Sequence, residues 1–353
     1  MKILNIVPDL SSGGAEKLVA ELNQQFVIRK HKSITLTLCN NKNDSTQSLN
    51  HKKPYDALKA PHRLISWYLK NGPFEIVHLH LTPAQLLAPY IKLIDPQAIL
   101  VTTEHSTTNR RRQLRFGTLL DAVLYFQFSK VVCISQGSRQ FLTKDRPYLK
   151  QKTSVILNGI DSSRFRRSEV EQDPTLILSV GRLVHAKNFH SAILALKNIR
   201  DLNFKYLIAG TGPEQQKLQD LIINSRLEDK VKLVGHIQNI PRFLSKGSIF
   251  LTPSNSEGFG LAAAEAMASG LAIIGSNVPG LREVIGEDNE SCLLSNPTDL
   301  DKMSSNLRAV LMNSALRERL QSNALKRSKK FSILDSSDRH LCLYNHLNSP
   351  EII

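Results

Sequence analysis

Short apolar runs alternate with longer segments of helical periodicity along almost the whole chain. The runs are rich in Ile, Leu and Val, as buried strands are. The strands expected from these runs are residues 3–7, 33–39, 74–81, 99–103, 130–134, 152–157, 176–180, 204–209, 231–233, 249–252 and 271–275. Strands that alternate with helices form parallel sheets in βαβ units, so the pattern predicts an α/β protein.

The helical segments fill most of the intervals between these runs. They begin near residue 18 and include residues 64–70, 84–94, 119–128, 136–142, 190–198, 214–224, 240–245, 261–268, 300–325 and 334–347. Residues 40–62 are polar and predict a loop, and residues 162–173 are interpreted as a linker between two βαβ series. The prediction is therefore two Rossmann-like domains, residues 1–165 and 166–329, that face each other across a cleft.

Composition excludes several classes of protein. The 353 residues are 41% hydrophobic, which is enough for two cores. The four cysteines lie far apart without a CxxC pair, which argues against a disulfide scaffold and a zinc site and favours a cytoplasmic protein. The start of the chain has no signal-peptide pattern, and no apolar stretch approaches the roughly 20 residues of a transmembrane helix.

Positive charge is concentrated in the first half of the chain. The net charge is +15, of which residues 1–165 carry +12 and residues 166–353 carry +3. Such a field indicates nucleic acid, acidic lipid or an anionic substrate, although it can also serve only solubility. No zinc-finger spacing or aromatic RNA-binding strand accompanies the charge, so nucleic acid is not expected.

Two carboxylates, Glu257 and Glu265, flank the stretch Gly-Phe-Gly-Leu-Ala-Ala-Ala. A glycine-rich turn at the start of a helix leaves backbone N–H groups free to receive an anion, and glycine lets a ligand approach closely. The backbone from Gly258 to Leu261 could therefore hold phosphates or sugar oxygens. The plainer interpretation is a strand–turn–helix corner with incidental acids.

Other polar groups are expected at the ends of the predicted strands, where open α/β sheets bind ligands. Arg182 and Lys187 lie five residues apart after one strand, and two cations suit a diphosphate. Glu265 could then accept hydrogen bonds from two ribose hydroxyls, and Glu257 from a second sugar. For a lone Arg or Lys, however, a solvated surface charge is the ordinary interpretation.

Three histidines stand at or near strand ends in the first half. His78 and His80 alternate in one strand, and a metal pair is less favoured there than a strand end facing the cleft, since no carboxylate or third histidine lies near in sequence. His105 follows another strand and is either a structural histidine or a cleft residue.

The stretch from Glu257 to Glu265 resembles the E-x7-E motif of the retaining GT-B glycosyltransferases of family 4. The resemblance extends in order through Gly13-Gly14-Ala15-Glu16, His105, Asn158-Gly159-Ile160-Asp161, Gly181-Arg182 with Lys187-Asn188, Gly210-Thr211-Gly212-Pro213, Gly235-His236, the E-x7-E motif, and Pro279-Gly280 with Glu283. It implies a GT-B fold in which the last helix, residues 330–350, returns to the N-terminal domain. It also implies a metal-independent enzyme without a cofactor, which uses a UDP- or GDP-linked sugar as its substrate.

The resemblance assigns roles position by position. Arg182 and Lys187 would bind the donor diphosphate, Glu265 the ribose and Glu257 a hydroxyl of the donor sugar, with His105 near the donor sugar and the acceptor. His105, Arg182, Lys187 and Glu257 are thus the expected catalytic residues. The remaining donor-binding positions would be Gly13, Gly14, Gly210, Gly212, Gly235, His236, Gly258, Phe259, Gly260, Leu261 and Glu265.

The expected reaction is transfer of a hexose or N-acetylhexosamine to a saccharide acceptor in the synthesis of a polysaccharide, lipopolysaccharide or glycolipid. The basic N-terminal half would dock on anionic lipid at the inner face of the cytoplasmic membrane, where a lipid-linked acceptor resides. The alternative is a sugar-nucleotide epimerase on the same two-domain fold. A binding module without activity is disfavoured because Arg182, Lys187 and Glu265 are all present, and a dehydrogenase because GxGxxG is absent after the first strand.

Overall fold

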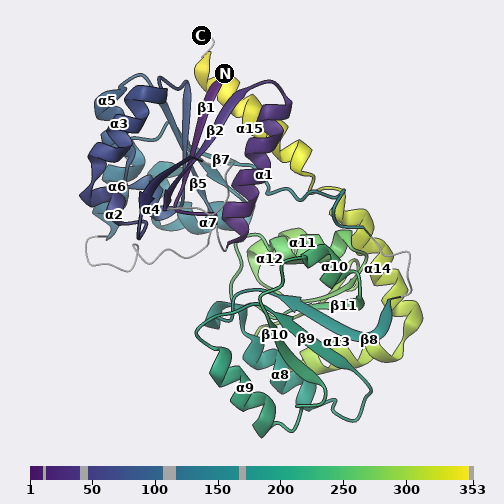
Figure 1. Ribbon diagram of the computed structural model, residues 1–353. Coiled ribbons are helices and arrows are strands. Elements are labelled where there is room, and N and C mark those ends of the chain that lie inside the picture. The colour runs from purple at the N-terminus through teal and green to yellow at the C-terminus, as the bar shows by residue number, and fades with distance from the viewer. Residues whose placement is uncertain (11–12, 40–46, 106–116, 167–171, 350–353) are drawn as a thin grey trace. The chain divides into compact units, whose positions relative to one another are not determined.

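The structure is a computed structural model that describes residues 1–10, 13–39, 47–105, 117–166 and 172–349. The chain divides into two compact units (Figure 1). Unit 1 contains Met1–Gly159 and Ile333–Ile353, and unit 2 contains Ile160–Ser332. Among the described helices, none combines the length and the apolar composition needed to cross a membrane.

Unit 1 is built on a seven-stranded parallel sheet with strand order β3-β2-β1-β4-β5-β6-β7. The strands are β1 (Lys2–Val7), β2 (Lys32–Cys39), β3 (Gln47–His51), β4 (Ile76–His80), β5 (Ile99–Glu104), β6 (Lys130–Cys133) and β7 (Thr153–Val155). The helices are α1 (Gly14–Ile28), α2 (Asp56–Lys59), α3 (Pro61–Asn71), α4 (Leu81–Gln85), α5 (Ala88–Ile94), α6 (Gly117–Phe126), α7 (Gln136–Asp145) and α15 (Ile333–Asn348), with a 3₁₀ turn at Pro147–Leu149.

Alternate residues of these strands feed two separate cores, because successive side chains of a strand point to opposite faces. On one face, Ile3 and Ile76 pack with α1 and α15, and on the other, Leu4 and Val77 pack with α3, α5 and α6. Tyr344 of α15 is fully buried in the first core. Unit 1 is therefore completed by the end of the chain.

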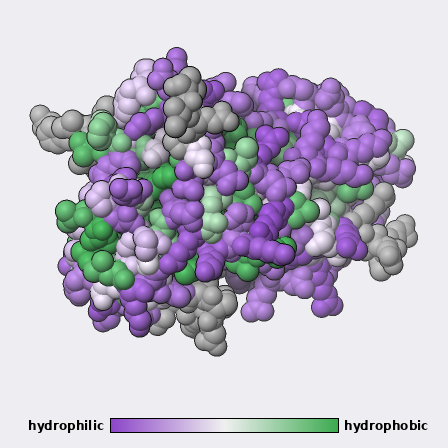
Figure 2. Space-filling model, turned by 90° about the horizontal axis from the view of Figure 1, so that it is seen from above, coloured by the Kyte–Doolittle hydropathy of each residue, from purple (hydrophilic) through white to green (hydrophobic). Residues whose placement is uncertain are grey.

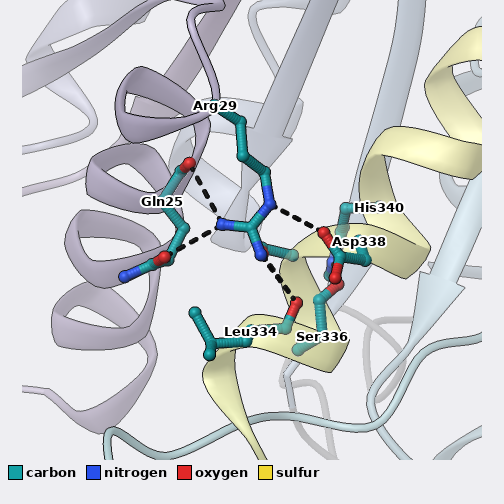
Figure 3. Close-up of polar contacts among 7 residues, drawn as sticks. Gln25, Arg29, Leu334, Ser336, Asp338 and His340 are labelled. Atoms are coloured by element: carbon teal, nitrogen blue, oxygen red, sulfur yellow. Dashed lines mark hydrogen bonds and ion pairs between the residues drawn. The ribbon is translucent and has the colours of Figure 1, made fainter.

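A polar contact at the surface adds to this attachment of α15. Arg29, directly after α1, donates a hydrogen bond from Nε to Asp338 Oδ1 at 2.7 Å and another to the carbonyl of Leu334 at 3.5 Å (Figure 3). Its guanidinium also donates to Gln25 Oε1 at 2.9 Å. Figure 1 shows α15, in yellow, lying beside α1.

Unit 2 contains a six-stranded parallel sheet with strand order β10-β9-β8-β11-β12-β13. The strands are β8 (Asp173–Val180), β9 (Lys205–Ala209), β10 (Val231–Gly235), β11 (Gly247–Thr252), β12 (Ala272–Ser276) and β13 (Cys292–Ser295). The helices are α8 (Phe189–Lys197), α9 (Gln215–Asn224), α10 (Ile240–Leu244), α11 (Leu261–Ala268), α12 (Pro279–Ile285), α13 (Leu300–Met312) and α14 (Ser314–Ser328), with a 3₁₀ turn at His185–Lys187. Because β10, β9, β8 and β11 are neighbours, their carboxyl ends form one continuous edge.

The predicted α/β class is confirmed, but several local predictions were wrong. The helix expected over 84–94, for example, is divided between α4 and α5. The described part of residues 40–62, expected to be a loop, contains β3 and α2. The strand β3 was missed because Leu49 is its only large apolar residue, which gives no clear alternation. The helix expected over 300–325 is two helices, since the Asn313 side chain accepts from the backbone N–H of Leu316 and starts a new one. Pro279 and Gly280 of the resembling motifs open α12, because proline fits the first turn of a helix.

Candidate functional site

The site in unit 2 begins with the segment that follows β8. Asn188 adopts the left-handed conformation with φ 52° and ends the short turn that carries Lys187. The Asn188 side chain donates to the carbonyls of Pro253 and Pro297, both at 3.1 Å. This amide therefore ties the loop with Lys187 to the segment that follows β11.

Lys187 Nζ forms an ion pair and hydrogen bond with Glu257 Oε2. The two side chains are 26% and 16% exposed, so solvent screens the pair only partly. Ser254 Oγ donates to the same carboxylate oxygen at 3.3 Å. A small pocket lined by Lys187, Ser254, Glu257 and Gly260 lies at this point. The structure thus brings together two of the residues predicted to be catalytic, although they are 70 positions apart in sequence.

The glycine-rich turn then leads directly into α11. Gly260 is the residue before the helix and has φ 96°, a conformation that other residues rarely adopt. Phe259 is 2% exposed and packs edge-on against Phe331 with ring centroids 5.5 Å apart, so its side chain belongs to the core. Leu261 begins α11, and Glu265 lies one turn into it, partly exposed.

The other predicted residues of unit 2 lie along the same edge of the sheet. Arg182 directly follows β8 with its neighbour Gly181, and its side chain is exposed, with no ionic partner among the described residues. Gly210 follows β9, and its N–H donates to the carbonyl of Gly235 at the end of β10 at 2.7 Å. His236 is exposed beside it.

Close backbone packing explains why glycine occupies positions 210 and 212, in the loop that follows β9. A Cβ atom at Gly210 would lie 1.9 Å from the carbonyl oxygen of Gly181, and one at Gly212 would lie 2.3 Å from that of Leu183. These glycines let the loops after β8 and β9 touch. Whether they also contact a donor stays a prediction.

In unit 1, the predicted residues lie at the carboxyl ends of β1 and β5. Gly13 precedes α1, and the Glu16 carboxylate folds over it, since a Cβ at Gly13 would lie 1.8 Å from Glu16 Oε2. Gly14 is the first residue of α1. His105 directly follows β5, whereas residues 106–109 of the same predicted motif, like residues 11–12, lie outside the described residues.

His105 belongs to a buried histidine cluster, which we define as His78, His80, His105 and His340. His80 Nδ1 lies 3.2 Å from His105 Nε2, and the rings of His78 and His80 stack with centroids 3.9 Å apart. His78 is hydrogen-bonded through Nδ1 to the hydroxyl of Tyr344 at 2.6 Å and through Nε2 to Thr103 Oγ1 at 2.7 Å. These contacts support the structural alternative for His105, and its place in a cleft stays a prediction.

Burial holds the histidine cluster in its neutral form. Desolvation, followed by the neighbouring imidazoles, lowers the pKa of His78 and His80 well below the ordinary value. Desolvation and the proximity of His340 lower the pKa of His105 to about 4, and burial lowers that of His340 to about 4 as well. The described residues contain no group of three or more histidines, cysteines and acids arranged to hold a metal ion.

Two family models together match most of the chain. The model "Glycosyltransferase Family 4" matches residues 12–164, and "Glycosyl transferases group 1" matches residues 161–327. The chain belongs to glycosyltransferase family 4, group 1 type. The resemblance seen in the E-x7-E motif and its companions is confirmed.

Solved structures share the fold of this family 4 chain. Sucrose-phosphate synthase from Thermosynechococcus elongatus has a TM-score of 0.84 at 19% identity and covers 98% of this chain and 99% of its own. Anabaena HepE, solved with UDP and glucose, also has a TM-score of 0.84, at 18% identity and with the same coverage. At such identities the likeness concerns the fold alone, and it confirms the predicted GT-B architecture.

Curated relatives differ in how much of the chain they match. The chain is 26% identical over 344 residues to an N-acetylgalactosamine-N,N'-diacetylbacillosaminyl-diphospho-undecaprenol 4-alpha-N-acetylgalactosaminyltransferase of Campylobacter jejuni, covering 91% of this chain and 93% of that protein. It is 32% identical over 199 residues to glycogen synthase of Mycobacterium tuberculosis, covering 54% of this chain and 47% of that one. This family 4 chain therefore spans about half the length of several curated relatives that it matches.

The sequence did not indicate two features of these sites. The alternation of His78 and His80 was visible, but their partners Asn5 and Tyr344 lie 75 and 266 positions away from His80 and His78, respectively. The pairing of Lys187 with Glu257 was likewise not predicted, because Lys187 was expected to bind the donor diphosphate and Glu257 a hydroxyl of the donor sugar. Opposite charges following neighbouring strands of the predicted sheet were the only signal that could have suggested it.

Proposed function

We propose that this chain is a retaining glycosyltransferase that transfers a hexose or N-acetylhexosamine from a nucleotide-sugar to a lipid-linked saccharide acceptor. The observation that carries the proposal is the ion pair of Lys187 and Glu257, which adjoins the glycine turn before α11. A cation, a carboxylate and a helix N-terminus meet at that point, and a nucleotide-sugar offers a diphosphate and sugar hydroxyls to match them.

These charges account for stabilisation of the diphosphate leaving group. As the bond between the sugar and the diphosphate breaks, negative charge develops on the leaving oxygen, and Lys187 and Arg182 stabilise it. These cations do the work that a metal ion does in other transferases. Glu265 accepts hydrogen bonds from the ribose, and Glu257 from a hydroxyl of the transferred sugar, while it also holds Lys187 in place.

The acceptor and the linkage are argued from the relatives. The Campylobacter protein, matched over nine-tenths of both chains, is named as acting on a diphospho-undecaprenol saccharide with formation of an alpha linkage. HepE was solved with UDP and glucose. We therefore assign a lipid-linked saccharide as the acceptor class, and a UDP-linked sugar as the first donor to test, ahead of a GDP-linked one.

A thermal-shift screen with UDP, GDP and their common sugars tests the donor site. A nucleotide at 100 times its Kd stabilises the folded state by about 2.7 kcal/mol, which raises the melting temperature by several degrees. The shift should be lost in Lys187→Ala and retained in Lys205→Ala, an exposed lysine at the opposite end of β9. No shift with any nucleotide would contradict the proposal. Conversion of a UDP-sugar without an acceptor would favour the epimerase alternative instead.

Unit 1 supplies a surface for contact with the membrane. Residues 1–165 carry a charge of +12, and Phe126 and Val123 of α6 are 82% and 59% exposed. Lys152 Nζ lies 5.4 Å from the centroid of the Phe126 ring, so apolar and positive groups adjoin there. Figure 2 shows other exposed hydrophobic residues, in green, among hydrophilic ones on the face of the molecule that it draws. Each basic residue near an anionic membrane adds about 1 kcal/mol to binding.

Co-sedimentation with vesicles tests this contact. Phosphatidylglycerol vesicles should bind the protein at low salt and release it at high salt, and phosphatidylcholine vesicles should not bind it. Phe126→Ser should weaken binding, whereas Ile223→Ser, which changes an exposed apolar residue of unit 2, should not. Binding that is absent, or that does not respond to salt, would exclude docking through charge.

A further inference from the structure

Two residues behind His105, Asn5 and His80, have no part in the proposed function. Asn5 lies in β1 and is 2% exposed, and His80 ends β4 and is also 2% exposed. They form a row of hydrogen-bonded side chains with His105. Asn5 Oδ1 lies 3.5 Å from His80 Nε2, and His80 Nδ1 lies 3.2 Å from His105 Nε2. Since β1, β4 and β5 are neighbouring strands, this row of hydrogen bonds runs across the sheet near its carboxyl edge.

The orientation of the Asn5 amide is fixed from its other side. Asn5 Nδ2 donates to Asn23 Oδ1 at 3.3 Å and to Ser33 Oγ at 3.4 Å. Ser33 Oγ donates its own proton to Asn23 Oδ1 at 2.6 Å, so its lone pairs face Asn5. With the Asn23 amide placed as it is in the structure, both groups are acceptors toward Asn5, and the Asn5 oxygen is the atom that faces His80.

This orientation determines where the protons of the two imidazoles lie. An amide oxygen only accepts, so His80 Nε2 must carry a proton. A neutral imidazole carries one proton, which leaves His80 Nδ1 as an acceptor. His105 Nε2 must then be the donor to His80, and His105 Nδ1 has only a lone pair. Burial supports the neutral form, because desolvation lowers the pKa of both histidines.

We infer that Asn5 and His80 are positioning residues that hold His105 in the Nε2–H tautomer, with Nδ1 presented as an acceptor for a sugar hydroxyl. His105 Nδ1 is buried and has no hydrogen-bond partner among the described residues. A buried acceptor without a hydrogen bond is unfavourable, and a hydroxyl donated by a substrate would satisfy it. In this tautomer, His105 cannot donate a proton to the substrate from either nitrogen. The inference rests on the proposed function, because a sugar substrate has to reach unit 1.

Nitrogen-15 NMR of the histidine-labelled full chain tests the tautomer without any activity. The His105 resonances are assigned as those that disappear in His105→Gln. At pH 7 they should show a protonated Nε2 and an unprotonated Nδ1. A protonated Nδ1 would overturn the inference even if the chain transfers sugar. Failure of the proposed function would appear separately, as nucleotides that do not bind at Lys187.

Variants of Asn5 separate a positioning role from a structural one. Asn5→Leu is nearly the same size but removes the acceptor, so His105 should populate both tautomers and kcat should fall about tenfold. Asn5→Asp keeps an acceptor oxygen facing His80 and should restore the tautomer and most of kcat. Tyr344→Phe is the matched control, because it removes a hydrogen bond of 2.6 Å from His78 in the same cluster but does not touch His80 or His105. Equal losses in Asn5→Leu and Tyr344→Phe, with His105 unchanged in its spectrum, would show that Asn5 is only structural.

Discussion

The two units have similar parallel sheets but carry different polar groups at the carboxyl edges of those sheets. Each places polar side chains at the carboxyl edge of a parallel sheet. In unit 2 these groups are charged and partly exposed, with Lys187 paired to Glu257 and Arg182 open to solvent. In unit 1 they are imidazoles, held neutral by burial and hydrogen-bonded to one another. Charged groups suit a diphosphate and neutral acceptors suit hydroxyls, so the two edges are suited to ligand groups of different chemistry.

The largest effect is expected from breaking the charged edge. Lys187→Ala removes a cation from the leaving diphosphate and leaves the Glu257 carboxylate unpaired beside it. Loss of one such stabilising group costs about 10²–10³ in kcat. Transfer assays with radiolabelled donor measure it, and Glu265→Ala should also lower kcat/KM, through loss of the ribose contact. Lys205→Ala should behave as wild type, and near wild-type rates in Lys187→Ala would refute the assignment of unit 2.

The neutral edge predicts a response of stability to pH. For His105 and His340 the pKa in the folded state is lowered to about 4, against about 6.5 in the unfolded chain. Between these values the unfolded state binds more protons, so the free energy of unfolding falls as the pH falls from 6.5 toward 4. Each residue contributes about 1.4 kcal/mol per pH unit within that window.

Denaturant unfolding at pH 7.5, 6.5, 5.5 and 5.0 measures this slope. His340→Leu keeps the site buried and removes one titrating group, so the slope should decrease by about one proton. His190→Gln changes an exposed histidine at the start of α8 and should leave the slope unchanged. A free energy of unfolding that is constant over this range would show that the histidine cluster takes up protons in the folded state.

The sequence predicted unit 2 more fully than unit 1 for a physical reason. The candidate site residues of unit 2 lie in short loops after strands, so Arg182, Lys187 and Glu257 are visible as local motifs. The network of unit 1 joins β1, β4, β5 and α15, and its hydrogen bond between His78 and Tyr344 links residues 266 positions apart. Periodicity places His78 and His80 on one face of a strand, but it does not indicate which distant side chains meet them. Short elements such as β3 were missed because one buried leucine gives no clear period.

The smallest effect is expected where unit 1 does carry an ion pair. Arg29 and Asp338 are 25% and 61% exposed, although their atoms lie 2.7 Å apart (Figure 3). Exposed pairs contribute about 0.2–1 kcal/mol and are screened by salt. Arg29→Ala should therefore lower the free energy of unfolding by less than about 1 kcal/mol, less at high salt, and leave kcat unchanged. Denaturant unfolding at two salt concentrations measures it, with Lys30→Ala, an exposed neighbour, as the control. A larger loss would mean that α15 depends on this surface charge, whereas the buried position of Tyr344 indicates that the apolar core holds the helix.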